Sequence, residues 1–336
     1  MRKLALSLAL ILAPLTGFAF EIEDHIRFGA PEAAREIRII STADIAFFEP
    51  VVRTFIAGNA DVAVDYSVAS STELMRAIYD EGAAFDLAIS SAMDLQIKLA
   101  NDGFARRYIS GQELPDWATW RDTVFAFTQE PAAIVVSDAA FEGLAKPQNR
   151  QELIRVLRQN PDRFAGRVGT YDVRQSGLGY LFATQDTRAS ETYWRLTEVM
   201  GSLRAKLFCC SSDMIDAVEN GELAVAYNVL GSYAANRQDS GRFSIILPTD
   251  FTTVMLRTAL IPETAPSPEL AELFLDHMLQ QAFVGSGGVR LDRSLVGQGA
   301  EAGLNRIDLG PGLLVFLDQL KRRAFLSEWE SAILQR

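Results

Sequence analysis

The chain has 336 residues, 49% of them hydrophobic, and a formal net charge of −11 at pH 7. A chain of this length and apolar content can form large hydrophobic cores, and size scaling favours two lobes over one. Its acidic balance argues against nucleic acid or an anionic lipid surface as a partner, although one cleft can be locally positive on an acidic protein.

Residues 1–19 are predicted to form a signal peptide. Arg2 and Lys3 precede an apolar run at 4–15, and Ala19 is a small residue directly before a plausible cleavage site. This layout is typical of a secretory leader. The alternative is a short membrane anchor, but a bilayer span takes about 20 apolar residues. We therefore expect a protein exported to the periplasm.

Short apolar runs alternate with amphipathic segments after the leader. This rhythm predicts an α/β fold, with a mostly parallel sheet that is covered by helices on both faces. In chain order, the pattern predicts strands at 37–40, 62–66 and 85–89, followed in turn by helices at 45–57, 72–80 and 93–101.

The apolar stretch 123–136 is too long for one ordinary strand, and Gln129, Glu130 and Pro131 interrupt it. We interpret it as a segment that leaves one lobe and enters another. The α/β alternation restarts after it. The predicted elements are helices at 151–159, across 178–203 and at 213–219, strands at 167–171, 206–209, 223–229, 243–247 and 253–261, and a helical tail.

Two α/β units joined by extended segments near 130 and 248 predict a hinged pair of lobes. The first lobe is then discontinuous, comprising 20–130 and 249–336, and the second comprises 131–248. Ligands of such folds bind where strand ends and helix starts face a crevice, so we expect a ligand between the lobes.

Small polar residues recur between a strand end and the next helix start. Free backbone N–H groups and the helix dipole make such places suitable for anions. The alternative is that these residues only cap helices, since Ser70-x-x-Glu73 and Ser91-x-x-Asp94 both fit a capping box. The ligand-binding residues predicted on this basis are Ser70, Ser71, Thr72, Ser91, Ser176 and Gly177.

Four further residues are weaker candidates for contacting the ligand. Arg174 lies beside the Ser176 step, and Arg257 interrupts an apolar strand, where it needs a carboxylate, a carbonyl or a bound anion. Tyr227 and Asn228 close a predicted strand and can donate hydrogen bonds into a crevice. The alternatives are a salt-bridged Arg257, a solvated Arg174 and a Tyr227 packed in the core.

Motifs of catalysis and metal binding are missing from the sequence. His25 and His277 are the only histidines, and no paired-histidine or Cys-x-x-Cys spacing, nucleophile elbow or Walker A loop is present. We predict no catalytic residue, no metal ligand and no cofactor. The adjacent Cys209 and Cys210 are expected to be two buried thiols at a strand end, the alternative being a strained disulfide between neighbours.

Several segments resemble bacterial extracellular solute-binding proteins of the ferric-iron type of ABC transporter. These are 37–41, 70–74, 86–95, 216–222 and 226–228. A further likeness, at 90–96 with 101–103, is to a subgroup that includes phosphoglycerate-transport regulatory proteins. The resemblance implies a monomeric protein of the type 2 periplasmic-binding-protein fold, joined by a two-segment hinge, whose partner is a membrane permease, a sensor kinase or both.

The iron-binding relatives hold the metal with a His, an acidic residue and paired tyrosines. Here the segment 42–44 contains no His, and Tyr227 stands without a second Tyr. The relatives also seat an anion at a Ser-Gly helix start, which Ser176 and Gly177 match. We therefore expect a small phosphorylated or carboxylated solute. The alternatives are a ferric-iron-binding protein, an exported enzyme on the same fold and a purely structural exported protein.

Overall fold

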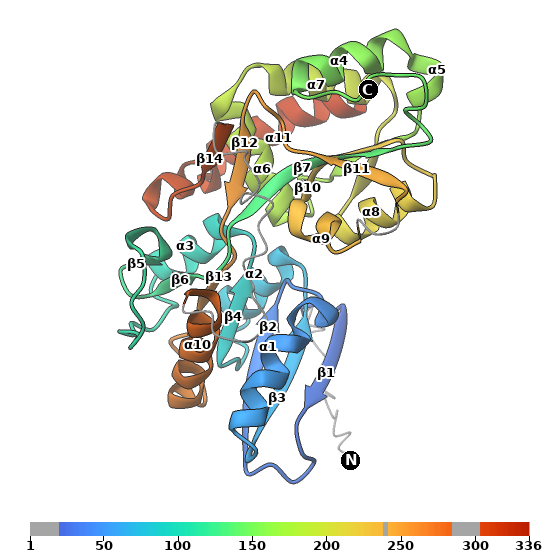
Figure 1. The fold of residues 1–336 in the computed structure, drawn as a ribbon. Helices are drawn as coiled ribbons and strands as arrows, with labels where there is room; N and C mark the ends of the chain where they lie inside the picture. The colour runs from blue at the N-terminus through green and yellow to red at the C-terminus, as the bar shows by residue number, and fades with distance from the viewer. Residues whose placement is uncertain (1–19, 238–240, 284–302, 336) are drawn as a thin grey trace, which may run out of the picture.

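The computed structural model describes residues 20–237, 241–283 and 303–335, which form two α/β lobes, each built on a mixed sheet (Figure 1). The predicted fold class is therefore confirmed. The predicted signal peptide lies outside the described residues. Within these ranges, no helix combines the length and the apolar character needed to cross a membrane.

The first lobe lies at the bottom of Figure 1. Its strands are β1 (Asp24–Phe28), β2 (Arg35–Ser41), β3 (Val62–Val68), β4 (Leu87–Ser90), β5 (Thr119–Trp120), β6 (Val124–Ala126) and β13 (Thr258–Leu260), and its helices are α1 (Ile45–Gly58), α2 (Ser71–Tyr79), α3 (Met93–Asn101), η1 (Asp116–Ala118) and α10 (Pro268–Phe283). The strand order is β1-β3-β2-β4-β13-β6-β5. As predicted, β2, β3 and β4 are parallel, with α1 and α10 on one face and α2 and α3 on the other. The expectation of a mostly parallel sheet is wrong, because the other pairings in this sheet are antiparallel.

The second lobe lies at the top of Figure 1. Its strands are β7 (Glu130–Ser137), β8 (Val168–Tyr171), β9 (Lys206–Phe208), β10 (Val225–Leu230), β11 (Phe243–Ile246), β12 (Thr252–Met255) and β14 (Leu304–Arg306), and its helices are α4 (Arg150–Gln159), α5 (Pro161–Phe164), α6 (Gly177–Ala189), α7 (Thr192–Ser202), α8 (Ser211–Glu219), α9 (Gly231–Ala235), η5 (Pro311–Leu317) and α11 (Gln319–Leu334). The order is β14-β12-β7-β10-β8-β9, and β11 also pairs with β7.

Among the described residues, two antiparallel segments carry the chain between the lobes. One runs from β6 to β7, as the long apolar stretch predicted, and the other runs from β12 to β13. The predicted second crossing near 248 is wrong, because the apolar stretch 253–261 is not one strand. Arg257 divides it, so that β12 pairs in the second sheet and β13 in the first.

The described residues from 303 onward belong to the second lobe. There β14 pairs with β12, and α11 packs on α7 through Phe325, Trp329 and Ile333. The contact is close at Gly201 of α7, where a Cβ atom would lie 2.3 Å from a backbone oxygen of α11. This placement differs from the predicted partition, which put all of 249–336 in the first lobe, because helical spacing alone does not reveal which core a helix joins.

A buried ion pair ties the two crossing segments together. Arg257 Nε lies 2.8 Å from Glu130 Oε1, and both side chains are almost fully buried. Glu130 also accepts hydrogen bonds from Thr128 and Ser232, and the Arg257 backbone N–H donates to Thr128 Oγ1. Burial alone would raise the pKa of Glu130, but Arg257 and these hydrogen bonds outweigh it and hold the pKa below its ordinary value. The salt-bridged alternative for Arg257 is therefore the one observed.

Glu130→Gln should destabilise the protein strongly at pH 7. Removing one partner of a buried pair leaves an uncompensated charge and typically costs about 3–5 kcal/mol. Because the folded pKa of Glu130 is lowered, the contribution of the pair is present above about pH 4.3 and is lost as the pH falls through the folded pKa. Urea unfolding at several pH values measures both effects. Arg107→Gln, which breaks the exposed pair with Asp122, is the control and should change stability little; an equal loss in both variants would contradict the prediction.

A second buried carboxyl lies where α3 of the first lobe packs on η5 and α6 of the second. Burial raises the pKa of Asp94 to about 7, although the Leu95 backbone N–H and the charge of Arg322 oppose this rise. The folded protein therefore binds a proton that the unfolded chain has already released between about pH 4 and pH 7.

Asp94→Asn should consequently raise the free energy of unfolding above pH 7, since Asn cannot ionise and pays no desolvation penalty of that kind. The difference from the unmodified protein should fall toward zero below about pH 4, where Asp94 is protonated in both states. Thermal melts across this pH range provide the measurement. A constant difference at every pH would show that folding does not shift the pKa of Asp94 and would contradict the prediction.

Candidate functional site

A cavity of about 70 Å³ lies between the lobes. Ordinary ligand pockets have volumes of about 300–1,000 Å³, so the lobes lie close together in this structure. The first lobe lines the cavity with Glu23, Thr42, Asp44, Ala69, Ser70, Ser71 and Ser91. The second lobe lines it with Tyr171, Gln175, Ser176, Leu178, Cys209, Cys210, Ser211, Ser212, Leu230 and Tyr233.

Four helices direct their N-termini at this cavity. Their N-cap residues all line it: Asp44 for α1, Ser70 for α2, Ser176 for α6 and Cys210 for α8. Two of these helices belong to each lobe. The first turn of a helix has backbone N–H groups without intrahelical acceptors and carries about half a positive charge. The cavity therefore has a positive backbone potential from both sides.

The capping alternative is correct for two of the predicted serines. Ser70 Oγ accepts from the Glu73 N–H, and Ser176 Oγ accepts from the Gly179 N–H. It is wrong for Ser91, because the N-cap of α3 is Ala92; Ser91 Oγ instead lies 3.3 Å from Thr42 Oγ1. Ser70, Ser91 and Ser176 all line the cavity nevertheless. We call Ser70, Ser71, Ser91 and Ser176 the hydroxyl set.

Direct contacts join the lobes around the hydroxyl set. Thr72 Oγ1 donates to the Gln175 carbonyl, at 3.1 Å. Gly177 packs so closely on the first lobe that a Cβ atom there would lie 2.6 Å from Ser71 Oγ and 3.0 Å from a methyl carbon of Leu95. The predicted residues Thr72 and Gly177 thus lie at the contact between the lobes. The absence of a side chain at Gly177 permits this contact.

A second group of contacts joins the lobes near α1. The Asp44 N–H donates to the Tyr233 hydroxyl at 3.3 Å, and the rings of Phe47 and Tyr233 are stacked 5.3 Å apart. Burial raises the pKa of Tyr233 to about 12, so its hydroxyl is neutral. Tyr233 is thus both a cavity wall and a bridge between the lobes.

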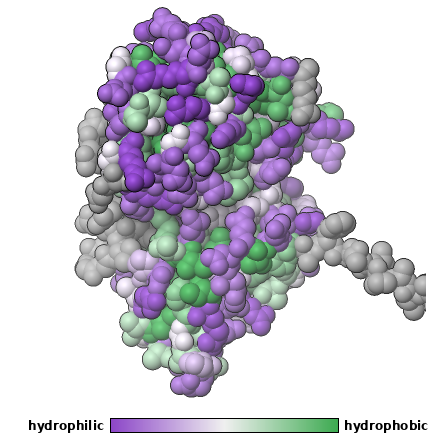
Figure 2. Space-filling view, turned by 90° about the vertical axis from the view of Figure 1, so that its right-hand side faces the viewer, coloured by the Kyte–Doolittle hydropathy of each residue, from purple (hydrophilic) through white to green (hydrophobic). Residues whose placement is uncertain are grey.

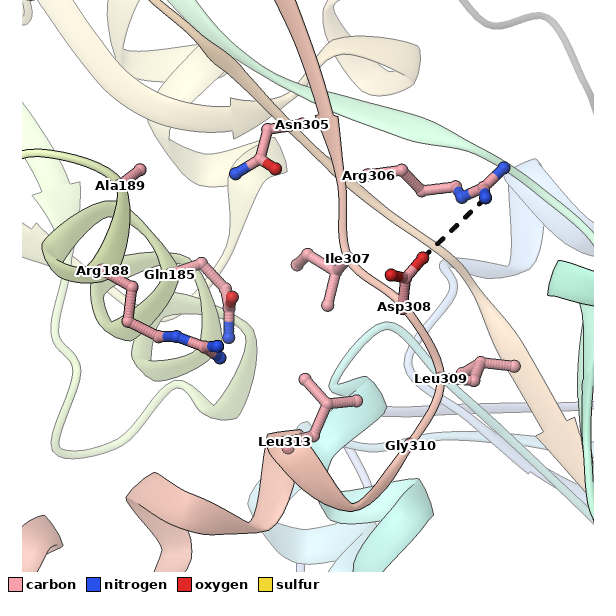
Figure 3. A pocket seen from close by; sticks show the side chains of 11 residues that line it. Gln185, Arg188, Ala189, Asn305, Arg306, Ile307, Asp308, Leu309, Gly310 and Leu313 are labelled. Atoms are coloured by element: carbon pink, nitrogen blue, oxygen red, sulfur yellow. Dashed lines mark ion pairs between the residues drawn. The ribbon is translucent and has the colours of Figure 1, made fainter.

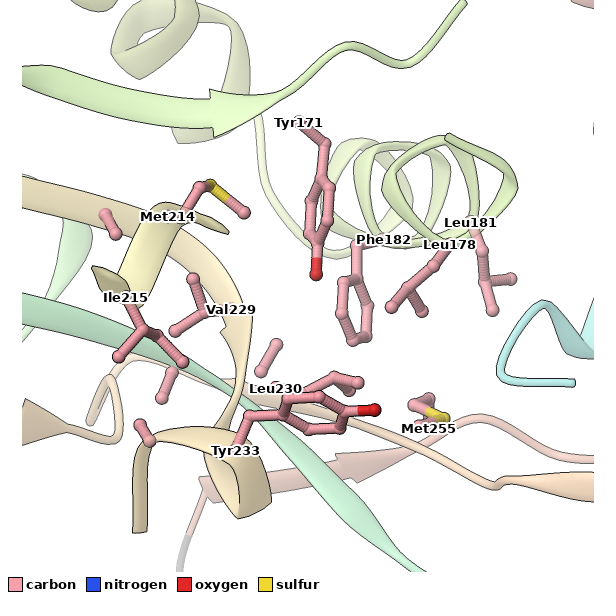
Figure 4. Packing of buried hydrophobic residues seen from close by; sticks show 14 of the residues in the cluster. Tyr171, Leu178, Leu181, Phe182, Met214, Ile215, Val229, Leu230, Tyr233 and Met255 are labelled. Atoms are coloured by element: carbon pink, nitrogen blue, oxygen red, sulfur yellow. The ribbon is translucent and has the colours of Figure 1, made fainter. Parts of the chain in front are cut away.

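The cavity adjoins an apolar cluster to which both lobes contribute (Figure 4). Belonging to the cluster and also lining the cavity are Tyr171, Leu178, Leu230 and Tyr233. Tyr171 of β8 and Tyr233 of α9 reach into this cluster from opposite sides, with Leu230 nearby (Figure 4). The Ser211 hydroxyl forms a hydrogen bond with the Tyr171 hydroxyl and accepts one from the Leu230 N–H. The Tyr171 hydroxyl is therefore already hydrogen bonded within the second lobe.

Acidic residues face each other across the cavity mouth. Glu23 and Asp44 come from the first lobe and Asp213 from the second, close to the two cysteines. Burial, followed by the charges of Asp44 and Asp213, raises the pKa of Glu23. Burial also raises the pKa of Asp44, against the opposing effect of Arg257 and Arg237. We call Glu23, Asp44, Cys209, Cys210 and Asp213 the acidic set.

Six predicted residues do not line this cavity: Thr72 and Gly177 lie at the contact between the lobes, and the other four lie elsewhere. The Arg174 side chain pairs with Asp172 at 2.6 Å and with Glu330 at 3.5 Å, because a salt bridge within its own lobe is available. Arg257 lies behind the wall, where its guanidinium is 5.9 Å from the Tyr233 ring centre and binds Glu130.

Tyr227 and Asn228 belong to a buried network instead. The Tyr227 hydroxyl and the Asn228 amide both donate to Asp186, which also pairs with Arg150. The network joins β10, α6 and α4 within the second lobe. The alternative of a Tyr packed in the core is thus the one observed.

Sequence reasoning missed several residues that line the cavity. Thr42 and Asp44 follow β2 at the same sheet edge as the predicted serines, so the position alone could have indicated them. Glu23, Tyr171 and Tyr233 carry no such signal. The cysteines were expected to be buried thiols, but Cys209 is exposed and Cys210 half-buried, because the strand ends at the cavity mouth.

A wider cavity of about 390 Å³ lies elsewhere, between the end of α6 and residues 305–313 (Figure 3). Arg188 and Gln185 border it from α6, and Arg306 and Asp308 pair with each other at 3.8 Å on the opposite side. All of its lining residues belong to the second lobe. It cannot respond to motion of one lobe against the other, so the smaller interlobe cavity is the better candidate site.

Comparisons with known proteins agree with this architecture. A family model described as bacterial extracellular solute-binding protein matches residues 37–287. The crystal structure of the substrate binding protein of an ABC transporter from Agrobacterium tumefaciens has 32% sequence identity and a TM-score of 0.85, over 92% of this chain and 98% of that one. No curated protein sequence matches the chain.

Two more distant structures share the fold alone. The periplasmic binding protein AfuA from Actinobacillus pleuropneumoniae, with bound fructose-6-phosphate, is 16% identical, with a TM-score of 0.71 over 89% of this chain and 99% of that one. Iron-bound HitA from Pseudomonas aeruginosa is 15% identical, with a TM-score of 0.62 over 88% and 99%.

Gly177→Ala should hold the lobes apart. The added methyl group would collide with Ser71 across the cleft, and opening relieves the collision. Because Ala favours a helix over Gly by about 1 kcal/mol, α6 itself should not be weakened. Small-angle X-ray scattering should show a larger radius of gyration. Gly58→Ala, in α1 with open space around the new methyl, is the matched control; equal radii in the two variants would contradict the prediction.

Proposed function

Because the chain belongs to the bacterial extracellular solute-binding protein family, we propose that it captures a small solute between its two lobes and delivers it to the membrane permease of an ABC transporter. Proteins of this family bind solutes and are not enzymes. The proposal places the protein in the periplasm as a monomer, after cleavage near residue 19. The observation that carries it is the interlobe cavity, which both lobes line with polar residues at helix starts.

The solute carries an oxyanion in this proposal, either a phosphate or a carboxylate. The N-termini of α2 and α6 meet at the hydroxyl set, where N–H groups and serine hydroxyls can donate to it. Ser176 and Gly177 begin α6 at this meeting point, which supports the proposal that they bind the anion. Arg257 lies behind Tyr233 but does not reach the cavity, and Glu130 compensates its charge.

The acidic set opposes an anion and therefore restricts where it binds. Glu23 and Asp44 repel a phosphate, so the oxyanion is expected against α2 and α6 and the rest of the solute toward α1 and α8. Hydroxyl groups on the solute can donate to the two carboxylates. A phosphorylated or carboxylated polyol has this combination of groups.

Ferric iron is the second candidate, because Glu23, Asp44, Tyr171 and Tyr233 all line the cavity. Hard anionic oxygen ligands suit that ion. However, burial raises the pKa of both tyrosines, which disfavours the phenolate form that binds iron. Their hydroxyls are also engaged, with Ser211 and with the Asp44 N–H. These contacts favour the oxyanion solute over iron.

Closure by the solute provides the signal that a membrane partner reads. A solute that contacts both lobes binds the closed form more tightly and shifts the population toward it. The partner is a permease, a sensor kinase or both. Uptake of a labelled solute and transcription of its operon, measured in cells with the gene deleted, separate transport from signalling.

Matched solutes test the oxyanion proposal. We expect phosphorylated or carboxylated solutes to raise the melting temperature, and their uncharged counterparts, such as glucose beside glucose 6-phosphate, to leave it unchanged. A solute at 100 times its dissociation constant stabilises the folded state by about 2.7 kcal/mol. Ser212→Trp fills the cavity and should abolish the shift, whereas Ser331→Trp, on the exposed face of α11, should not. Stabilisation by ferric citrate alone, with iron retained after dialysis, would favour the iron alternative.

A further inference from the structure

Two thiols and a carboxylate meet at the start of α8. Cys209 follows β9, Cys210 is the N-cap of α8, and Asp213 lies in its first turn. One donor atom from each residue lies within 4.8 Å of the other two, and Cys209 Sγ is 3.6 Å from Asp213 Oδ2. The three side chains therefore form a compact group of sulfur and oxygen donors.

The spacing of this group matches a zinc-type site. A Zn–S bond of about 2.3 Å and a Zn–O bond of about 2.0 Å at the tetrahedral angle separate sulfur from oxygen by about 3.5 Å. The observed 3.6 Å agrees with this value. Thiolates select Zn²⁺, Cd²⁺ and similar soft cations over Mg²⁺ and Ca²⁺, which prefer sites made of oxygen alone.

A further carboxylate lies near this group on the other lobe. Glu23 lines the same cavity as Cys209 and Cys210, although it lies outside the group whose donor atoms are all within 4.8 Å of one another. The Glu23 backbone is fixed to the first lobe by its N–H, which donates to the Val68 carbonyl. A cation between these residues would relieve their mutual repulsion and would be held from both sides of the cleft.

We infer that Cys209, Cys210 and Asp213 bind a thiophilic divalent cation of the zinc type, with Glu23 as the fourth ligand from the facing lobe. The inference goes beyond solute capture, because it concerns the cavity mouth rather than the hydroxyl set. The cation neutralises the acidic set, and so it also removes the repulsion that an oxyanion meets on entering the cleft. The Cys-Cys-x-x-Asp order is not a common metal-binding spacing, and for this reason no motif indicates the site.

Metal binding to the purified, reduced protein is the direct test. After treatment with a chelator, we expect equilibrium dialysis to give about one Zn²⁺ per chain, released in a competition assay only by strong chelators. Cd²⁺ in place of Zn²⁺ should produce the ultraviolet charge-transfer band of a cadmium thiolate. Zinc uptake without this band would show binding at other residues and would overturn the inference.

Variants assign the ligands. Cys209→Ser with Cys210→Ser should weaken Zn²⁺ binding at least about 100-fold, and Asp213→Asn about 10-fold or more, because each removes a donor. Asp216→Asn is the matched control on the same helix; its carboxylate pairs with Arg237, so the affinity for Zn²⁺ should not change. An unchanged affinity in the cysteine variant would overturn the site, and the cadmium band of the unmodified protein decides the question even if that variant fails to fold.

The role of Glu23 has a separate readout. Zn²⁺ should reduce the radius of gyration of the unmodified protein, whereas Glu23→Gln should bind Zn²⁺ about 10-fold more weakly and show no such reduction. A compaction that persists in Glu23→Gln would refute the contribution of the first lobe. Solute affinity, measured with the metal removed, tests the proposed function independently, so the two proposals can fail separately.

Discussion

The ion pair between Glu130 and Arg257 is the constraint on which the arrangement of the lobes depends. Both crossing segments pass this point, and a charge that is buried there must remain paired. The pair therefore constrains how the two crossing segments can move relative to each other. Because Ser232 also bonds Glu130, the position of α9 and of Tyr233 on the cavity wall follows from the same pair. One salt bridge thus positions both the crossing segments and one wall of the cavity.

The cleft combines two opposed electrostatic features. Four helix N-termini supply positive potential from the backbone, whereas the acidic set supplies negative charge from side chains. The first is permanent, because it is part of the fold. The second depends on protonation and on bound cations. A site of this kind can distinguish solutes by the separation of their charged and neutral groups, and not only by net charge.

Much of the fold could be predicted from the sequence because hydrophobic period is a local property. The strands at 37–40, 62–66 and 85–89 and their helices are found within a few residues of the predicted positions. What could not be predicted depends on tertiary placement. No local signal shows that Arg257 divides one apolar run between two sheets, or that α11 belongs to the second lobe. For the site, strand ends indicated Ser70, Ser91 and Ser176. Arg174 was predicted wrongly, because its side chain forms a salt bridge with Asp172. Glu23 could not be predicted, because β1, which follows it, has no distinct sequence pattern.

The placement of α11 in the second lobe affects the order in which the two lobes can fold during synthesis. A chain that is threaded N-terminus first releases the whole first lobe once α10 has emerged. At that stage the second lobe still lacks α11, the helix that covers α7. The two helices pack closely at Gly201, which has no side chain. The apolar face of α7 stays uncovered until residue 334 has emerged. The second lobe therefore completes its core later than the first, once α11 is available to cover α7.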